Sequence, residues 1–170
     1  LAAVFDLAAD ADLIVTSGGA SVGDHDLVGK TADALGMERA FYKIAMRPGK
    51  PLMAGRLRGI PMLGLPGNPV SSIVCGHVFM LPMIRAMQGA GKIAQTPQRA
   101  VLGSDTPANG PRAHYMRARL QHGDGGLLIF PYERQDSALL GVMAAADALM
   151  IRPVGGAALP AGAVVEYLPI

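Results

Sequence analysis

"RPGKPLMAGRLRGIPMLGLPGNPVSS", residues 47–72, combines cationic side chains, five prolines and two glycine-containing turns, and it leads directly into a long apolar run. "PLMAGRL" and "IPMLGLP" are typical of two strands. The following "NPVSSIVCGHVFMLPMIRAMQG" predicts a helix, with Asn68 as its N-cap and Pro69 at its first position, where the missing N–H costs nothing. A strand, a glycine turn and a helix in this order indicate an α/β layer.

The residues before this stretch extend the same pattern. "LAAVFDLAAD" has helical spacing, and "DLIVTSGG" is typical of a buried parallel strand that ends in a glycine pair. "DLVGKTADALG" predicts a helix that Gly36 caps, and "ERAFYKIAM" predicts one strand. We therefore expect residues 1–91 to form a parallel or mixed sheet flanked by helices, as part of an α/β domain.

After Gly91 the sequence changes to short strand candidates separated by Gly, Pro and Asp turns. They are "AQTPQRAVLGSD", "HYMRARLQ", "GLLIFPYE", "ADALMIRPVGG" and "GAVVEYLPI". This spacing favours a small all-β, barrel-like domain over residues 92–170.

The composition excludes several functions. The chain has 170 residues, of which 51% are hydrophobic and 16% charged, so it can fold around a core. It has no Trp, 4 Phe and 4 Tyr, and no long basic run, which argues against nucleic acid as a partner. The single cysteine, Cys75, excludes an internal disulfide and is interpreted as a buried apolar residue. Residues 70–84 contain His77 and Pro82 and are too short for a membrane span, so we expect a cytoplasmic protein.

The loop "TSGGASVGDHD" follows the first predicted strand, where open α/β sheets bind ligands. It lacks the GxGxxG and GxxxxGK[ST] spacings, so no nucleotide cofactor follows from it. Its glycines and hydroxyls exceed what a tight structural turn needs, and binding is therefore favoured. The candidate binding residues are Ser17, Gly18, Gly19, Ser21 and Gly23.

Asp24 and Asp26 lie at the expected start of the second helix. One of them is enough for an N-cap, and the pair could also hold Mg²⁺, which prefers carboxylate oxygens. The residues leave these two interpretations open.

Lys43, Arg47 and Lys50 are expected to line a rigid loop, because Pro48, Gly49 and Pro51 prevent a continuous helix through them. The "GLPGNPVSS" turn opens a helix whose free N–H groups favour an anion. Its candidate binding residues are Pro66, Gly67, Asn68, Pro69 and Ser71. Cations held near two such turns suggest a small polyanionic ligand. Arg117 and Ser137, by contrast, are interpreted from the sequence alone as part of a solvated strand face.

The motifs "TSGGASVGDHD", "KIAMRPGKPL" and "GLPGNPVSS", together with the segment from "QDSALLGVM" to the end, resemble the MoeA/gephyrin E-domain family of molybdopterin molybdenumtransferases. The resemblance covers nearly the whole chain, in the family's order. It implies transfer of molybdenum from molybdate to adenylylated molybdopterin, with release of AMP and with Mg²⁺ as cofactor. A scaffold module that binds molybdopterin without catalysis is the alternative.

The resemblance also assigns roles to single residues. It places Asp26, Lys43, Arg47 and Lys50 in the catalytic site, and it brings Arg117 and Ser137 towards that site as substrate-binding residues. Arg47 stands where the family often has Lys, which keeps the charge and changes its geometry. The family's proteins are longer and dimeric, so we expect this chain to be the C-terminal part of a homodimeric protein.

Overall fold

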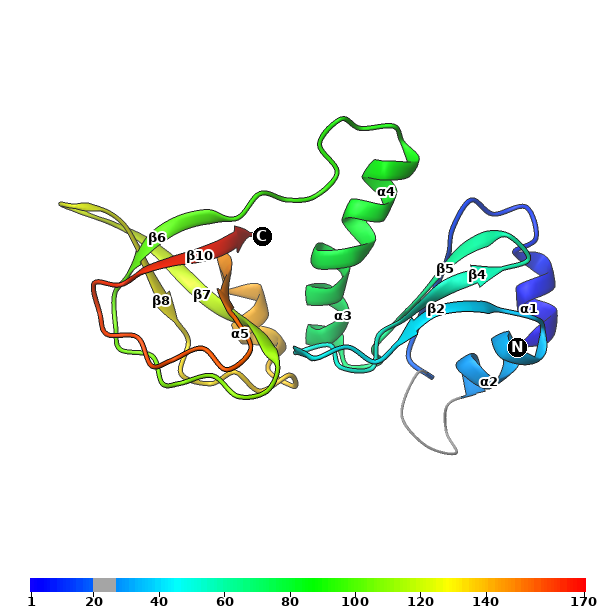
Figure 1. The fold of residues 1–170 in the computed structure, drawn as a ribbon, viewed down its shortest axis with the longest axis horizontal. Coiled ribbons are helices and arrows are strands. Elements are labelled where there is room, and N and C mark those ends of the chain that lie inside the picture. Colours follow the sequence, from blue (N-terminus) through cyan, green and yellow to red (C-terminus); the bar gives the residue numbers. More distant parts are fainter. Residues whose placement is uncertain (20–26) are drawn as a thin grey trace.

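The structure is a computed structural model that describes residues 1–19 and 27–170. It has two lobes, with a long helix standing between them (Figure 1). The predicted residues Ser21, Gly23, Asp24 and Asp26 lie outside the described residues.

The first lobe is a mixed sheet with the strand order β1-β5-β4-β2. Its strands are β1 (Ile14–Ser17), β2 (Glu38–Tyr42), β4 (Met53–Leu57) and β5 (Ile60–Leu65). The pair β1–β5 is parallel, whereas β5–β4 and β4–β2 are antiparallel. The prediction of a parallel or mixed sheet is therefore confirmed, and the mixed form is the one present.

Helices cover both faces of this sheet. α1 (Ala2–Leu7) and α2 (Leu27–Ala34) lie on one side, and the long helix lies on the other (Figure 1). Along β5 the side chains alternate between the two layers. Met62 belongs to the cluster with Phe5 and Val28, whereas Leu63 belongs to the cluster with Val70 and Val74.

The long helix starts where the sequence predicts. It consists of α3 (Pro69–Cys75), the π-helical segment η1 (Gly76–Met80) and α4 (Leu81–Met87). The Asn68 side chain accepts a hydrogen bond from the Ser71 N–H at 3.3 Å, which confirms the N-cap. Pro82 cannot donate to the helical ladder, and the wider π turn directly before it accommodates this break.

This helix is longer than the apolar stretch singled out in the sequence. The helix has 19 residues, and an 18-residue window of it has a mean hydropathy of 1.5, so it is long and apolar enough to cross a membrane. Of that window, 22% is buried inside the structure. The core helices of soluble proteins pass the same test, and Val70, Val74 and Cys75 are buried in the core here. The length and composition of the helix therefore fit both a membrane span and the core of a soluble protein.

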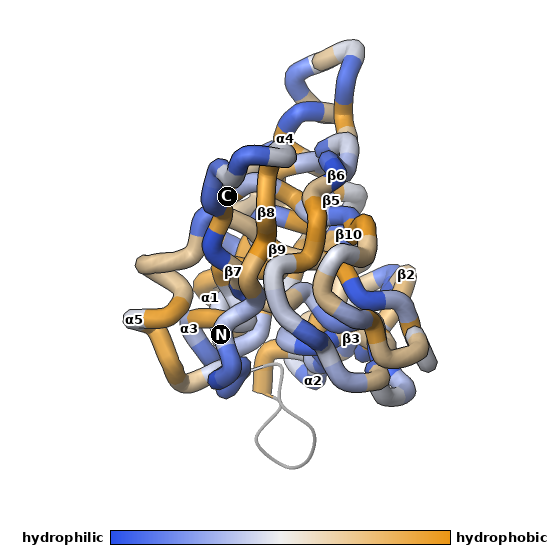
Figure 2. Tube along the Cα trace, turned by 90° about the vertical axis from the view of Figure 1, so that its left-hand side faces the viewer, coloured by the Kyte–Doolittle hydropathy of each residue, from blue (hydrophilic) through white to orange (hydrophobic). Residues whose placement is uncertain are grey.

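The second lobe is a closed barrel, as predicted. β7, β8, β6, β10 and β9 follow one another, and an additional β7–β9 pairing closes the ring. These strands are β6 (Gln98–Leu102), β7 (Ala113–Gly123), β8 (Gly126–Pro131), β9 (Ala148–Arg152) and β10 (Val164–Pro169). Figure 2 colours β8 as hydrophobic along much of its length, in keeping with a side chain such as Ile129 inside the barrel.

One short helix interrupts the expected all-β pattern of the second lobe. α5 (Leu140–Ala144) places Met143 in the core cluster that contains Leu65 and Val74 of the first lobe. This helix has only 5 residues, which is too short for a periodic signal in the sequence. Its position is set by packing between the lobes.

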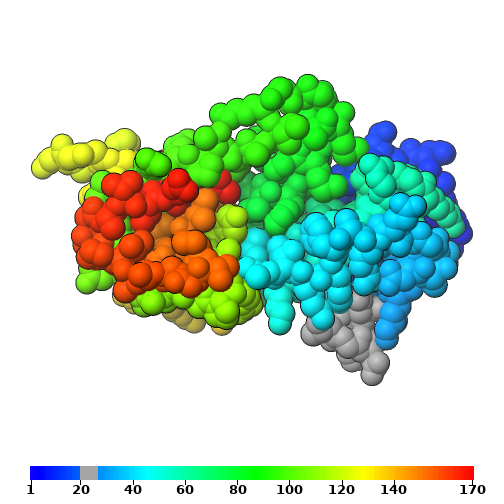
Figure 3. All heavy atoms as spheres, viewed as in Figure 1, coloured from blue at the N-terminus to red at the C-terminus, as the bar shows by residue number. Residues whose placement is uncertain are grey.

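The segment predicted as one strand, "ERAFYKIAM", divides between the two sheets. β2 ends at Tyr42, and Lys43 follows with a φ of 67°. The chain then crosses to the barrel, where β3 (Met46–Arg47) pairs in parallel with β7. Figure 3 shows these cyan residues packed against the second lobe.

The chain between the two sheets, residues 43–52, is called the crossing segment. Gly49 allows this segment to pack on the long helix. Its φ is +114°, and a Cβ atom at this position would lie 2.5 Å from the Cys75 Sγ atom. Cys75 itself is fully buried, as predicted, and burial raises the pKa of its thiol to about 12. A side chain at position 49 would therefore be strained and would clash with the helix.

We expect Gly49→Ala to lower the free energy of unfolding by about 1–3 kcal/mol, because it adds both backbone strain and overpacking. Urea denaturation followed by circular dichroism measures this change. Gly125→Ala is the matched control, since a Cβ atom at that position would have no heavy atom within 4 Å and the backbone there is not left-handed. Equal stabilities of the two variants would contradict this packing.

Candidate functional site

A polar cavity of about 450 Å³ lies where the two lobes meet. It is bounded by the crossing segment, the first turn of α3 and a loop of the second lobe. Its lining residues are Arg47, Pro48, Gly49, Lys50, Pro51, Ser71, Arg112, Gln135, Asp136 and Ser137.

The crossing segment is closed at its base by backbone hydrogen bonds. The Lys43 N–H donates to the Leu52 carbonyl at 2.9 Å, and the Ile44 N–H donates to the Lys50 carbonyl at 3.0 Å. At its tip, the Ala113 N–H of β7 donates to the Ala45 carbonyl at 2.8 Å. The cations of this segment are therefore carried on a backbone fixed at both ends.

The first turn of α3 forms the second wall of the cavity. Ser71 is buried and lines the cavity, while Asn68 caps the helix through the Ser71 N–H. The Ser72 hydroxyl donates to the Pro66 carbonyl, which ties the turn to the helix. The positive end of the helix dipole thus lies beside Lys50.

The glycine loops after β1 and β5 touch each other at the edge of the sheet. The Gly18 N–H donates to the Leu65 carbonyl at 3.1 Å, and a Cβ atom on Gly67 would lie 3.1 Å from the Gly18 Cα. Only two residues without side chains allow this approach. The carboxyl ends of the two parallel strands therefore meet here, at the same turn that opens α3.

A loop of the second lobe forms the third wall, and Arg117 holds it in place. The Gln135 side chain accepts from the Arg117 N–H at 3.0 Å and donates to the Arg117 carbonyl at 2.9 Å. The Arg117 guanidinium donates to the Asp136 carbonyl at 3.2 Å. Arg117 is fully buried and does not line the cavity, so here it fixes the loop that presents Ser137.

The structure thus divides the predicted site residues into groups. Four line the cavity: Arg47, Lys50, Ser71 and Ser137. Seven lie at the strand ends and the helix start next to it: Ser17, Gly18, Gly19, Pro66, Gly67, Asn68 and Pro69. Lys43 lies at the base of the crossing segment, with its Nζ atom 5.0 Å from the centre of the Tyr42 ring.

Three polar residues of the cavity, Arg112, Gln135 and Asp136, were not among the predicted site residues. Arg112 stands in the motif "PRAHYMRARL", whose pattern alone favours a solvated strand face. Gln135 and Asp136 directly precede Ser137, so the polar motif "ERQDS" was the available signal. Their contact with the crossing segment depends on the β3–β7 pairing, which the local sequence does not reveal.

The electrostatic environment around the cavity is strongly positive. Burial, followed by the charge of Arg47, lowers the pKa of the Arg117 guanidinium. Burial also lowers the pKa of His114 from 6.5 to about 4, with further contributions from Arg47, Arg117, Arg112 and Arg152. Cations from both lobes therefore converge on one region, which favours an anionic ligand.

The lowered pKa of His114 predicts a pH dependence of stability. Between pH 6.5 and about 4 the unfolded state binds a proton at His114 and the folded state does not, so stability falls as the pH falls through this window. The loss attributable to His114 is up to about 3 kcal/mol.

Urea denaturation at pH 7 and pH 4.5 measures this effect, with His114→Gln as the comparison. The variant removes the titrating group, so its stability should decrease less between the two pH values than that of the wild type. If both proteins lose the same free energy, His114 is not buried in its neutral form.

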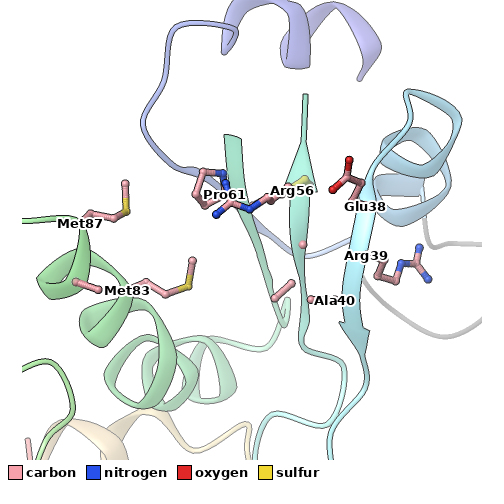
Figure 4. A pocket seen from close by; sticks show the side chains of 11 residues that line it. Glu38, Arg39, Ala40, Arg56, Pro61, Met83 and Met87 are labelled. Carbon is pink, nitrogen blue, oxygen red and sulfur yellow. The ribbon is translucent and has the colours of Figure 1, made fainter. Parts of the chain in front are cut away.

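A second, larger groove of about 550 Å³ lies between α4 and the sheet. Figure 4 shows Met83 and Met87 of α4 on one side and Pro61, Arg56 and the strand β2 on the other. None of the predicted site residues that the structure describes lines it. The smaller polar cavity is therefore the candidate site.

The described residues contain no group of three or more His, Cys, Asp or Glu side chains that could hold a metal ion. Asp136 is the carboxylate that lines the polar cavity. The predicted pair Asp24 and Asp26 lies outside the residues for which coordinates are described.

Comparison with protein families matches both lobes. Residues 1–86 match the model described as a probable molybdopterin binding domain. Residues 99–170 match the model described as the MoeA C-terminal region, domain IV. The predicted boundary at residues 91/92 lies between the two matches and stays a prediction.

Curated relatives are longer than this chain. It is 32% identical over 173 residues to the molybdopterin molybdenumtransferase of Bacillus subtilis, covering 99% of this chain and 39% of that protein. It is 38% identical over 128 residues to molybdopterin molybdenumtransferase 2 of Mycobacterium tuberculosis, covering 72% of this chain and 32% of that protein. The chain thus spans well under half the length of these relatives.

A solved structure has the same fold over nearly the whole chain. The molybdopterin biosynthesis MoeA protein of Pyrococcus horikosii superposes with a TM-score of 0.78 at 27% sequence identity. The superposition covers 99% of this chain and 40% of the archaeal one. The arrangement of sheet, long helix and barrel is therefore one that the solved structure also has.

Proposed function

Because the chain belongs to the MoeA family of molybdenum cofactor biosynthesis, we propose that it serves the transfer of molybdenum from molybdate to adenylylated molybdopterin, with release of AMP. One structural observation supports this proposal in addition to the family assignment. A single cavity brings Arg47 and Lys50 together with Ser71 of the α3 start and Ser137 of the barrel lobe.

Both substrates are anions, so bringing them together costs electrostatic repulsion. Fixed cations lower this cost without reorganising, because their backbone is already held in place. The Lys50 ammonium acts as a compact point charge, whereas the Arg47 guanidinium offers a planar fork to two oxygens. Ser71 and Ser137 add hydroxyl donors from opposite walls of the cavity. The residues thus bind and orient, and no nucleophilic side chain is required.

The remaining predicted residues take supporting roles in this proposal. The strand end with Ser17, Gly18 and Gly19, together with Ser21 and Gly23, would let the substrate approach the backbone closely, because the glycines have no side chain. Asp24 and Asp26 would hold Mg²⁺, which would neutralise phosphate charge when bound. Lys43 and Asp26 complete the proposed catalytic set. A cytoplasmic location and a homodimeric full-length protein are part of the same proposal.

A scaffold module that binds molybdopterin without catalysis is the second candidate. The observation in its favour is that the cavity cations Arg47, Lys50 and Arg112 suit an anionic ligand whether or not that ligand reacts. The two functions differ in one measurable respect. The enzyme releases AMP in the presence of molybdate, whereas the scaffold binds the adenylylated ligand and leaves it intact.

We expect Arg47→Ala and Lys50→Ala each to slow molybdate-dependent AMP release by about 10²-fold or more, as loss of a preorganised charge does in other enzymes. AMP is measured by liquid chromatography after mixing the protein, adenylylated molybdopterin and molybdate. Arg58→Ala is the matched control, because Arg58 lies on the β4–β5 turn and pairs with Asp6, away from the cavity.

Wild-type release by both cavity variants would refute the proposed site. Tight binding of adenylylated molybdopterin by the wild type, with no AMP released, would refute the enzyme and support the scaffold. Thermal unfolding of each variant distinguishes a lost charge from a lost fold.

A further inference from the structure

The open end of the barrel contains a second polar cavity, of about 260 Å³. It is separate from the candidate site, although Arg47 and Gln135 line both. The remaining lining residues are Thr106, Pro107, Ala108, Asn109, Gly110, His114, Met116, Glu133 and Arg152.

Three of these residues form a row across neighbouring strands. In the sheet register, His114 of β7 stands opposite Arg47 of β3 on one side and opposite Arg152 of β9 on the other. Residues that stand opposite one another in neighbouring strands project from the same face of a sheet. Met116 and Met150 form the next row on this face, below the polar one and inside the barrel.

The polar groups of this cavity are buried and lack partners. Arg152, His114 and Thr106 are 2%, 6% and 4% exposed, respectively. Within the described part of the chain, the Arg152 Nε and Nη1 atoms, the His114 Nε2 atom and the Thr106 Oγ1 atom have no hydrogen-bond partner. Buried polar groups of folded proteins are nearly always paired, so these groups need partners that are ordered water or a bound ion.

The residues that the structure describes do not supply the missing partners. The Arg152 guanidinium donates through Nη2 to the Ala157 carbonyl, which fixes its position and leaves the Nε and Nη1 nitrogens without a partner. Asn109 uses its side-chain amide on three backbone carbonyls and so serves to fix the loop. Glu133 is the carboxylate of the lining, and it forms no ion pair with Arg152 among the described residues.

We propose that this cavity binds a small tetrahedral oxyanion, of the sulfate, phosphate and molybdate class. Arg152 donates two N–H groups to it, the Thr106 hydroxyl donates one, and His114 donates from Nε2. Arg47, at the rim, supplies a second positive charge. The Met116 side of the cavity is apolar and excludes ligands larger than the ion from the barrel interior. The proposal does not rest on the proposed function, because it requires neither molybdopterin nor catalysis.

Sulfate is the first probe, because it is dianionic at neutral pH and takes no part in molybdenum transfer. The complete chain is labelled with ¹⁵N, and the titration of His114 is followed by NMR with and without sulfate. A bound anion stabilises the imidazolium, so sulfate should raise the apparent pKa of His114. Molybdate and phosphate, measured in parallel, rank the ions.

Two variants assign this effect to the cavity. Arg152→Gln should weaken sulfate binding about tenfold or more, because it removes charge-assisted hydrogen bonds. Thr106→Val keeps a similar shape, removes one donor and should weaken binding by a smaller factor. It remains informative if Arg152→Gln does not fold. Lys50→Ala is the matched control, because Lys50 lines the candidate site and not this cavity.

A sulfate-dependent shift of His114 that Lys50→Ala keeps and Thr106→Val reduces supports the proposal. A His114 titration that sulfate, phosphate and molybdate all leave unchanged overturns it, as does a shift that Lys50→Ala abolishes. These results are independent of AMP release, so the failure of the proposed function and the failure of this site are distinguishable.

Discussion

The parallel pairing of β3 with β7 holds the candidate site together. It is short, with Met46 opposite Ala113 and Arg47 opposite His114. It nevertheless carries the chain from one sheet to the other, and the buried Met46 joins the core cluster that both lobes share. Without this pairing, Arg47 and Lys50 would lie on an exposed loop of the first lobe. With it, they face the helix start and the loop that holds Ser137.

Local sequence patterns were sufficient to predict those parts of the fold that depend on residues close together in the sequence. The N-cap at Asn68, the parallel strand before Gly18 and the burial of Cys75 follow from residue types at fixed offsets, and the structure confirms all three. The expected burial of that strand is not met in the described sheet, where β1 lies at the edge and Val15 is exposed. The barrel was also predictable, because its strands are separated by clear turn residues. The prolines at positions 48 and 51 pointed to a rigid loop, because proline restricts the backbone wherever the loop lies.

The division of the strand at Lys43, the burial of Arg117 and the helix α5 depend on packing between residues distant in sequence. The local sequence pattern does not predict such packing. Residues 38–46 have the pattern of one strand, yet the chain turns at Lys43 and continues in the other sheet. The pattern around Arg117 favours a solvated strand face, whereas Gln135 and Asp136, far along the chain, draw this residue into the interior. The short helix α5 likewise forms where Met143 fills the space between the lobes. In each case the deciding partner is distant in sequence.

If the crossing segment, the α3 start and the Ser137 loop together form one anion site, that site should bind tungstate, a heavy analogue of molybdate. X-ray anomalous scattering from a crystal soaked in tungstate locates the ion. We predict a tungsten peak within hydrogen-bonding distance of Lys50, Ser71 and Ser137, and no such peak at this position in the Lys50→Ala variant. A well-ordered cavity without tungsten, while the ion binds elsewhere on the chain, would contradict the proposed site.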